Sequence, residues 1–304
     1  MIRIAAIGEI LFDLYPESKL IGGAPLNFIF HVYKITGDGK IISRIGDDDL
    51  GKRVMEFLDE KGIPKKYIQK DYYYPTGVAS VIIDVNKQPS FVINTEKAYD
   101  FIEVTPELEQ LVMKETDCLY FGTLAQRSEV TRETVKSLFN KRVKYFCDLN
   151  IRDNFVNKEV IERSLKTTDV LKVNLDELKL LDDLFLNELF EINKVSGEIM
   201  EKFSIEILAV TLGKDGSAIF RKSKSADETE GFDYYKPKPF DVVDTVGAGD
   251  AFASVLCIGY LQRWSLKKIN RLANNFAAEI CRTKGALPEN DDIYDFIKEK
   301  IRDD

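Results

Sequence analysis

Residues 244–250 read Asp-Thr-Val-Gly-Ala-Gly-Asp and constrain the fold more than any other stretch of the chain. The apolar run at 240–243 predicts a strand, and small or apolar residues recur at helical spacing from 248 to 259. The glycines therefore lie where a turn becomes the first turn of a helix. The first N–H groups of a helix lack partners and the dipole is positive there, so this turn predicts an anion site, above all for phosphate.

Asp250 closes this stretch at the rim of the predicted anion site. Since an acid is a poor phosphate ligand, we expect it to accept a proton from the group that attacks the phosphate. An ordinary alternative exists, because glycine-rich turns between strand and helix are common. An aspartate in a first helical turn is also a usual compensation for the helix dipole.

The seven residues match at every fixed position the signature Asp-Thr-x-Gly-Ala-Gly-Asp, and the chain resembles the PfkB, or ribokinase-like, carbohydrate kinases. The resemblance implies that Asp250 is the catalytic base and that the amides of Gly247, Ala248 and Gly249 form an anion hole. Strand and helix patterns alternate from residue 103 onward, which predicts an α/β fold. We expect a doubly wound, mostly parallel sheet with helices on both faces.

A second glycine turn, Gly-Gly-Ala-Pro-Leu-Asn at 22–27, precedes a predicted helix and resembles the first PfkB signature in fructokinase-like members. The resemblance implies that Gly23 and Asn27 hold a sugar, together with Asp13 beyond the first strand. Leu26 is bulkier than the residue usual there. His31, the only histidine, lies in the same predicted helix and is interpreted as structural.

Two further substrate contacts are expected beyond later strands. Gln126, or its neighbour Arg127, follows the predicted strand 118–122. Residues 148–152 read Asp-Leu-Asn-Ile-Arg and resemble the family's Asp-Pro-Asn-x-Arg. Arg152 is thus a candidate for the sugar or the transferred phosphate, since its planar fork suits oxygen pairs. A surface ion pair is the alternative for Arg152.

The nucleotide is expected at the ends of the next strands. Asn174 and Glu177 form an Asn-x-x-Glu pattern that is typical of a capping box. The family resemblance also places this pattern near ATP and Mg²⁺, with Glu177 acting through water. The remaining nucleotide-binding candidates that it implies are Thr211, Gly213, Gly216 and Asn274. In potassium-dependent members the positions of Asp244, Thr283 and Gly285 bind a monovalent cation.

Residues 72–94 interrupt the α/β pattern with two strand-like runs and a turn at 86–89, which predicts a hairpin. With residues 14–22 it predicts a small separate sheet, while residues 1–13, 23–71 and 95–304 form the α/β domain. Such a sheet has an apolar face with nothing of its own to cover it. We expect it to close over the site as a lid, to pair two subunits in a homodimer, or both.

Bulk properties exclude several classes of function. The formal net charge of −8 argues against nucleic acid or an anionic membrane as the main partner. The four cysteines show no paired spacing, which favours buried free thiols in a reducing compartment. The apolar start carries Glu9 and Asp13, so it is not a signal peptide, and we expect a soluble cytoplasmic protein.

The expected reaction is ATP-dependent phosphorylation of a sugar hydroxyl, most like that of a fructokinase. Ribokinase and 2-keto-3-deoxygluconate kinase are alternatives within the family, and a non-catalytic sugar-binding sensor is an alternative outside it. A nicotinamide enzyme is disfavoured because Phe252 stands where Gly-x-Gly-x-x-Gly needs a small residue. An ordinary Asp pKa of about 3.9 would leave Asp250 ionised at neutral pH.

Overall fold

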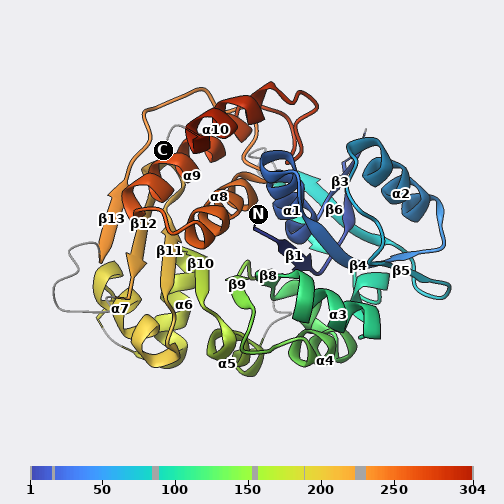
Figure 1. The fold of residues 1–304 in the computed structure, drawn as a ribbon, viewed down its shortest axis with the longest axis horizontal. Coiled ribbons are helices and arrows are strands. Elements are labelled where there is room, and N and C mark those ends of the chain that lie inside the picture. Colours follow the sequence, from blue (N-terminus) through green and yellow to red (C-terminus); the bar gives the residue numbers. More distant parts are fainter. Residues whose placement is uncertain are drawn as a thin grey trace.

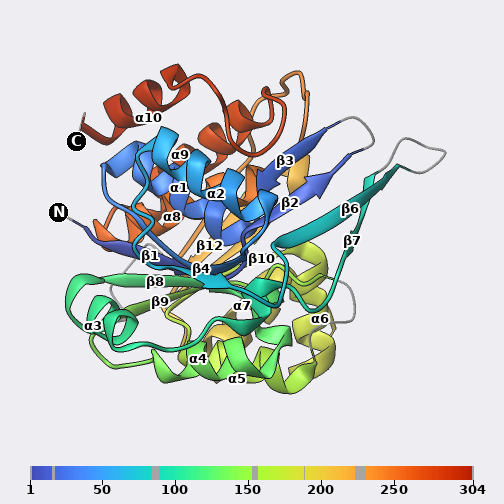
Figure 2. The same ribbon diagram turned by 90° about the vertical axis from the view of Figure 1, so that its right-hand side faces the viewer.

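A nine-stranded sheet runs through the molecule, and a four-stranded sheet stands at its side (Figures 1 and 2). The computed structural model describes residues 2–15, 18–83, 89–152, 157–187, 189–222 and 231–302. The large sheet has the spatial order β13 (Phe232–Tyr235), β12 (Ser217–Arg221), β11 (Ile207–Thr211), β10 (Val170–Asn174), β9 (Lys144–Asp148), β8 (Cys118–Gly122), β1 (Ile4–Ile7), β4 (Lys40–Gly46) and β5 (Ile68–Asp71). Neighbouring strands are parallel except β11–β12 and β12–β13.

Helices cover both faces of this sheet, which confirms the doubly wound fold (Figure 2). One face carries α1 (Ala24–Thr36), α2 (Asp49–Lys61), α8 (Ala248–Leu261), α9 (Leu266–Ile280) and α10 (Asp292–Arg302). The other carries α3 (Pro106–Glu115), α4 (Glu129–Ser137), α5 (Lys158–Thr167), α6 (Leu175–Phe185) and α7 (Ile192–Phe203). The central strand β1 shows why two cores form. Ile4 and Ala6 pack into the first core and Ala5 and Ile7 into the second, because strand side chains alternate between faces.

The carboxyl ends of the strands next to β1 mark the place for a site. The chain continues from β1 toward β4 on one side, while β8 and later strands lie on the other. Ligands of open α/β sheets bind where the strand order changes direction in this way. Helices α1 and α8 lie side by side above this point, which brings residues far apart in sequence together (Figure 1).

The small sheet has the order β3 (Lys19–Gly22), β2 (Leu11–Leu14), β6 (Gly77–Ile83) and β7 (Pro89–Ile93). The expected hairpin is the antiparallel pair β6–β7, although most of its turn lies outside the described residues. The sheet also takes in residues 11–13, so Asp13 lies on β2 rather than in a loop of the α/β body. At its base Leu11, Ala79 and Ile93 pack on Tyr99, Leu124 and Ala125 of the body.

Two expectations about single segments have clear outcomes. The strand predicted at 240–243 is wrong: the backbone N–H of Val243 donates instead to Cys281 O, and Val242 and Val243 are exposed. An apolar run alone could not reveal that no neighbouring strand is available for it. All four cysteines are buried and free, as expected. No helix among the described residues has the length and apolar character to span a bilayer.

Candidate active site

Helix α8 begins at the glycine motif, as expected. Its N-cap is Gly247 in the left-handed region with φ of 79°, and no side chain caps the first turn. A Cβ on Gly247 would collide with the Cβ and Cα of Ala286, so both the backbone conformation and the close approach require glycine. The first amides of α8 are therefore left without a side-chain partner, as an anion site needs.

Asp250 lies in the first turn of α8, half-buried beside the first turn of α1. Its Oδ2 accepts a hydrogen bond of 2.8 Å from Asn27 Nδ2. Burial, with the charge of Asp148, raises the pKa of Asp250 to about 6, against the opposing effects of Lys172, Asn27 and Arg152. The ordinary aspartate value is thus not retained, and Asp250 titrates close to neutral pH, which suits a general base.

The residues expected to hold a sugar gather around this bond. Gly23 is the N-cap of α1 with φ of 114°, and a Cβ there would collide with Glu9 O. A Cβ on Gly22 would lie 3.6 Å from Asp13 Oδ2 and 3.7 Å from Asn27 Oδ1. The structure therefore brings Asp13, Gly23 and Asn27 together. Burial raises the pKa of Asp13 to about 6.

Glu9 belongs to the same cluster, although the sequence analysis assigns it no contact with a ligand. Burial raises its pKa to about 7; the Ala24 backbone N–H counteracts the shift and the charge of Asp250 adds to it. Among the described residues, Glu9 Oε2 and Asn27 Oδ1 are buried oxygens without a hydrogen-bond partner. A buried acceptor left unpaired is costly, so both are positions where a ligand hydroxyl could donate.

The two later substrate candidates behave differently. Arg152 is exposed beyond β9, and its charge lowers the pKa of Glu9, Asp13 and Asp250, which places it at the site. Gln126 is buried in a 3-10 helix, and its Nε2 donates to Gly122 O and Ser164 Oγ. Its amide nitrogen is therefore engaged within the protein.

Sequence reasoning missed a buried ion pair beneath α8. Lys172 Nζ on β10 lies 3.0 Å from both carboxylate oxygens of Asp148 at the end of β9. A Cβ on Gly249 would lie 3.0 Å from this ammonium. The signal was available, because Lys172 is the one charge inside the apolar run of β10.

The nucleotide candidates lie along the ends of β10 and β11, where Asn174 and Thr211 are register partners. Asn174 and Glu177 form the capping box of α6, as the pattern allowed. Glu177 Oε1 accepts from Ile151 N, and Oε2 from Asn174 N. Gly213 and Gly216 both have positive φ in the turn from β11 to β12.

Asn274 lies on α9 and its side chain is already bonded within the protein. Its Nδ2 donates to Ser217 Oγ at 2.7 Å and to Asn270. These bonds tie α9 to β12, beside the turn that holds Gly213 and Gly216.

The three cation candidates lie in two loops that meet before α8. Asp244 Oδ1 accepts from Val246 N and Oδ2 from Gly285 N at 2.9 Å, while Thr283 Oγ1 donates to Ile280 O. Asp244 and Gly285 are thus in contact, but through an N–H donor rather than a carbonyl. Within the described part of the chain, no group of three or more His, Cys, Asp or Glu residues could hold a metal ion.

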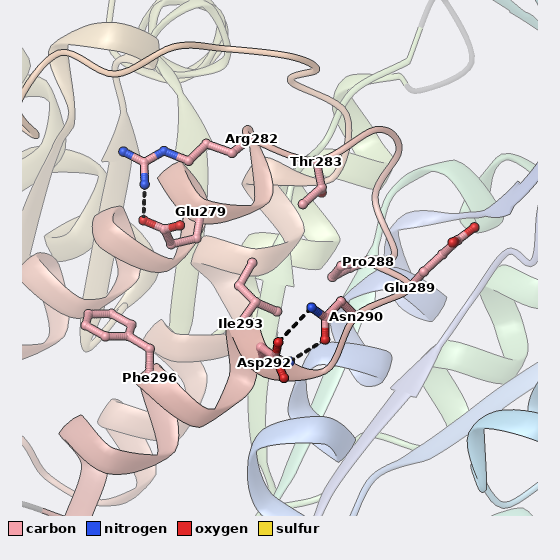
Figure 3. A pocket seen from close by; sticks show the side chains of 9 residues that line it. All are labelled: Glu279, Arg282, Thr283, Pro288, Glu289, Asn290, Asp292, Ile293 and Phe296. Atoms are coloured by element: carbon pink, nitrogen blue, oxygen red, sulfur yellow. Dashed lines mark hydrogen bonds and ion pairs between the residues drawn. The ribbon is translucent and has the colours of Figure 1, made fainter.

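A surface pocket of about 430 Å³ lies between α9 and α10 (Figure 3). Of the candidate residues, only Thr283 lines it. Besides Glu289, its other polar side chains bond to each other in two pairs, Glu279 with Arg282 and Asn290 with Asp292. The pocket contains none of the residues around Asp250, so the polar cluster at α1 and α8 remains the candidate active site.

Comparisons with known proteins agree with this geometry. The pattern of the pfkB family carbohydrate kinases matches residues 1–292. A Pyrococcus horikoshii protein that is named as a sugar kinase is 27% identical over 96% of this chain and 95% of its own. Its crystal structure covers 98% of both chains with a TM-score of 0.80, and another structure of it holds ATP.

The similar proteins carry more than one sugar name. A fructokinase of Klebsiella pneumoniae is 26% identical over 96% of this chain and 98% of its own. The structure of a 2-dehydro-3-deoxygluconokinase from Thermotoga maritima has a TM-score of 0.81 at 18% identity, covering 98% of this chain and 100% of that one. The last likeness concerns the fold alone.

Proposed function

The chain belongs to the pfkB family of carbohydrate kinases, and we propose that it is a fructokinase that transfers the γ-phosphate of ATP to a hydroxyl of fructose. As a family member it is a phosphotransferase with a sugar as acceptor. The bond from Asn27 Nδ2 to Asp250 Oδ2 carries the proposal. It joins the motif expected to grip the sugar to the carboxylate expected to receive its proton.

In the proposed mechanism the sugar hydroxyl lies between Asp250 and the γ-phosphate. The hydroxyl oxygen bonds to the γ-phosphorus, the bond from phosphorus to the β–γ bridging oxygen breaks, and ADP leaves. Asp250, ionised above about pH 6, accepts the hydroxyl proton. The amides at Gly247, Ala248 and Gly249 stabilise the charge on the phosphoryl oxygens, since no side chain caps the first turn.

We propose fructose as the substrate because of the hydrogen-bond acceptors in the cluster. The buried Glu9 packs against Gly23, and Asp13 and Asn27 lie next to Gly22, which supplies acceptors for several adjacent hydroxyls. A site built to pair with hydroxyls rejects a sugar that leaves these oxygens unpaired. The pairing of Gly8-Glu9 and Asp13 with Gly-Gly-Ala-Pro-x-Asn is the fructokinase-like feature of the sequence.

ATP would lie with its phosphates at α8 and its base toward the turn at Gly213 and Gly216. Mg²⁺ keeps much of its water and binds largely through phosphates, where it supplies positive charge. Glu177 fits a contact through water, because each of its oxygens accepts one backbone bond and retains a lone pair. Asp244, Thr283 and Gly285 are proposed to support a monovalent cation. Equal turnover in potassium and tetramethylammonium salts would remove that role.

A panel of acceptors tests the sugar. ADP release is measured with ATP and fructose, ribose, 2-keto-3-deoxygluconate or nucleosides, and we expect the largest kcat/KM for fructose. An inert fructose with another active sugar overturns the fructokinase proposal and leaves the family assignment intact. The sensor alternative requires sugar binding by calorimetry without ADP release from any mixture.

The small sheet is proposed to act as the lid and the dimer contact. It places Asp13 at the site, while Tyr73 is 92% exposed beside it and the sheet projects from the body (Figure 2). Deleting residues 73–94 should abolish turnover and leave a monomer in sedimentation. A deletion variant with near-normal turnover contradicts this role.

A further inference from the structure

A buried cation lies directly behind the proposed anion hole. Lys172 is only 7% exposed, and its ammonium is held by both carboxylate oxygens of Asp148, which is fully buried. Tyr120 donates a further bond of 3.2 Å to Asp148 Oδ2. Removing two charges from water is costly, and a hydrophobic pair is often as stable, so stability alone does not explain this ion pair.

The position of the ammonium explains why residue 249 is glycine. Gly249 does not have a positive φ, so its backbone conformation suits any residue. A Cβ at this position, however, would lie 3.0 Å from Lys172 Nζ. The ammonium is held by both carboxylate oxygens of Asp148, and it would have to shift to admit a Cβ. Gly249 thus allows a positive charge to approach the first turn of α8 from below.

The charges around Asp250 oppose one another. The charged and titratable groups that act on it or are acted on by it are Asp148, Lys172, Arg152, Glu9 and Tyr120, with Asn27 as its hydrogen-bond partner. Of the two buried charges, Asp148 raises the pKa of Asp250 and Lys172 lowers it. Burial opposes the charge on Lys172, but Asp148, Glu177 and Asp250 raise its pKa above the ordinary value. Lys172 therefore stays positive at neutral pH.

We propose that Lys172 is a positioning residue whose charge offsets Asp148, keeps Asp250 ionised and makes the beginning of α8 attractive to the transferred phosphoryl group. The inference rests on the proposed role of Asp250 as the base. Without Lys172, Asp148 would be an uncompensated negative charge beneath a site that must accept an anion. With Lys172, the ion pair is neutral and its positive end faces α8.

The test is the pH profile of kcat with saturating ATP and the most active sugar of the panel. Lys172→Met should move the acid limb upward by about one pH unit or more, the size expected for a neighbouring charge. Asp148→Asn together with Lys172→Met removes both charges and should return the limb toward that of the wild type. The shift of the limb on removal of Lys172 reports Asp250 and not Glu9 or Asp13, because Lys172 is among the groups that shift the pKa of Asp250 alone of these three carboxyls.

Lys144→Met is the matched control. Lys144 also pairs with acids, the half-buried Asp169 and the more exposed Glu206, but at the opposite end of β9. It should leave the acid limb in place whatever it does to stability. If Lys172→Met does not fold, the double variant still tests the inference. An uncharged pair at 148 and 172 should reproduce the acid limb of the wild type.

Two results overturn the inference. An acid limb of Lys172→Met that coincides with the wild type's shows that the charge does not act on Asp250. The second is a double variant whose acid limb is displaced from that of the wild type, either as in Lys172→Met or in another way. It shows that the charge balance between Lys172 and Asp148 does not set the acid limb. Asp250→Asn is measured alongside: if it retains turnover, the base assignment itself fails, which is a distinguishable outcome.

Discussion

Helices α1 and α8 begin in the same way and their first turns meet, yet the first turns lie against opposite charges. Each has a glycine N-cap with positive φ, Gly23 or Gly247, and no side-chain cap. Behind the start of α1 lies the buried carboxyl of Glu9, which interacts with the Ala24 N–H. Behind the start of α8 lies the ammonium of Lys172.

Under the proposed function, this difference allows one local motif to bind two different ligands. A helix N-terminus attracts anions through its free N–H groups and dipole. A carboxyl beside α1 satisfies part of that potential and leaves acceptors suited to neutral hydroxyls. The cation beside α8 leaves its donors open and adds to the potential. The buried group behind each helix therefore decides what the helix end can hold.

The largest effect should come from the acid of α8. Asp250→Asn removes the proton acceptor and should lower kcat by at least about 100-fold, within the roughly 10²–10⁴-fold range of general-base assistance. ATP affinity, measured by calorimetry, should change little. Asp49→Asn is the control, since Asp49 is an exposed acid in the first turn of α2. Wild-type turnover of Asp250→Asn would contradict the assignment.

Substituting the two N-cap glycines should affect different kinetic parameters, kcat for α8 and the KM for sugar for α1. Gly247→Ala pushes a Cβ into Ala286 and should lower kcat about tenfold or more, while Gly23→Ala pushes one into Glu9 O and should raise mainly the KM for sugar. Both change a positive-φ position, which costs about 1 kcal/mol or more by itself.

Gly37→Ala controls for that backbone cost. Gly37 also has positive φ, but nothing lies within 4 Å of the place that an added methyl group would take. The stability of this variant should fall by about 1 kcal/mol with unchanged kcat and KM. If all three variants alter kinetics alike, the separation between α1 and α8 is not supported.

Glu9→Gln should have the smallest kinetic effect and a pH-dependent effect on stability. Folded Glu9 keeps its proton until about pH 7, whereas the unfolded chain releases it near the ordinary glutamate pKa. Between these values the folded state binds more protons, so wild-type stability from this group is lost as pH rises. Glutamine does not titrate.

Urea unfolding measures the difference. The free energy of unfolding of Glu9→Gln, relative to the wild type, should rise by up to about 3 kcal/mol from pH 5 to pH 8. A difference that stays constant over this range would show that Glu9 does not titrate in the window. The contrast between a buried, protonated carboxyl at α1 and an ammonium at α8 would then not hold.

Local patterns predicted local structure well. The start of α8, the hairpin β6–β7 and the capping box of Asn174 and Glu177 each depend on neighbouring residues, and the structure contains all three. The strand expected at 240–243 depends on a partner elsewhere, and the N–H of Val243 bonds to Cys281 instead.

The polar side chains were harder to interpret. Gln126 and Asn274 look like ligand contacts in the sequence, but their amide nitrogens bond to Ser164 and Ser217 within the protein. The proposed role of Lys172 follows only from its neighbours, because β9 places Asp148 beside it and α8 passes above. Such relations depend on how distant elements pack, which no single stretch of sequence encodes.

The contact between Asn27 and Asp250 joins residues 223 positions apart. During translation α1, which is proposed to hold the sugar, leaves the ribosome long before α8, which carries Asp250. The proposed sugar site and the proposed base can therefore meet only after residue 250 has been synthesised. The candidate active site is thus assembled late, when α8 packs beside α1.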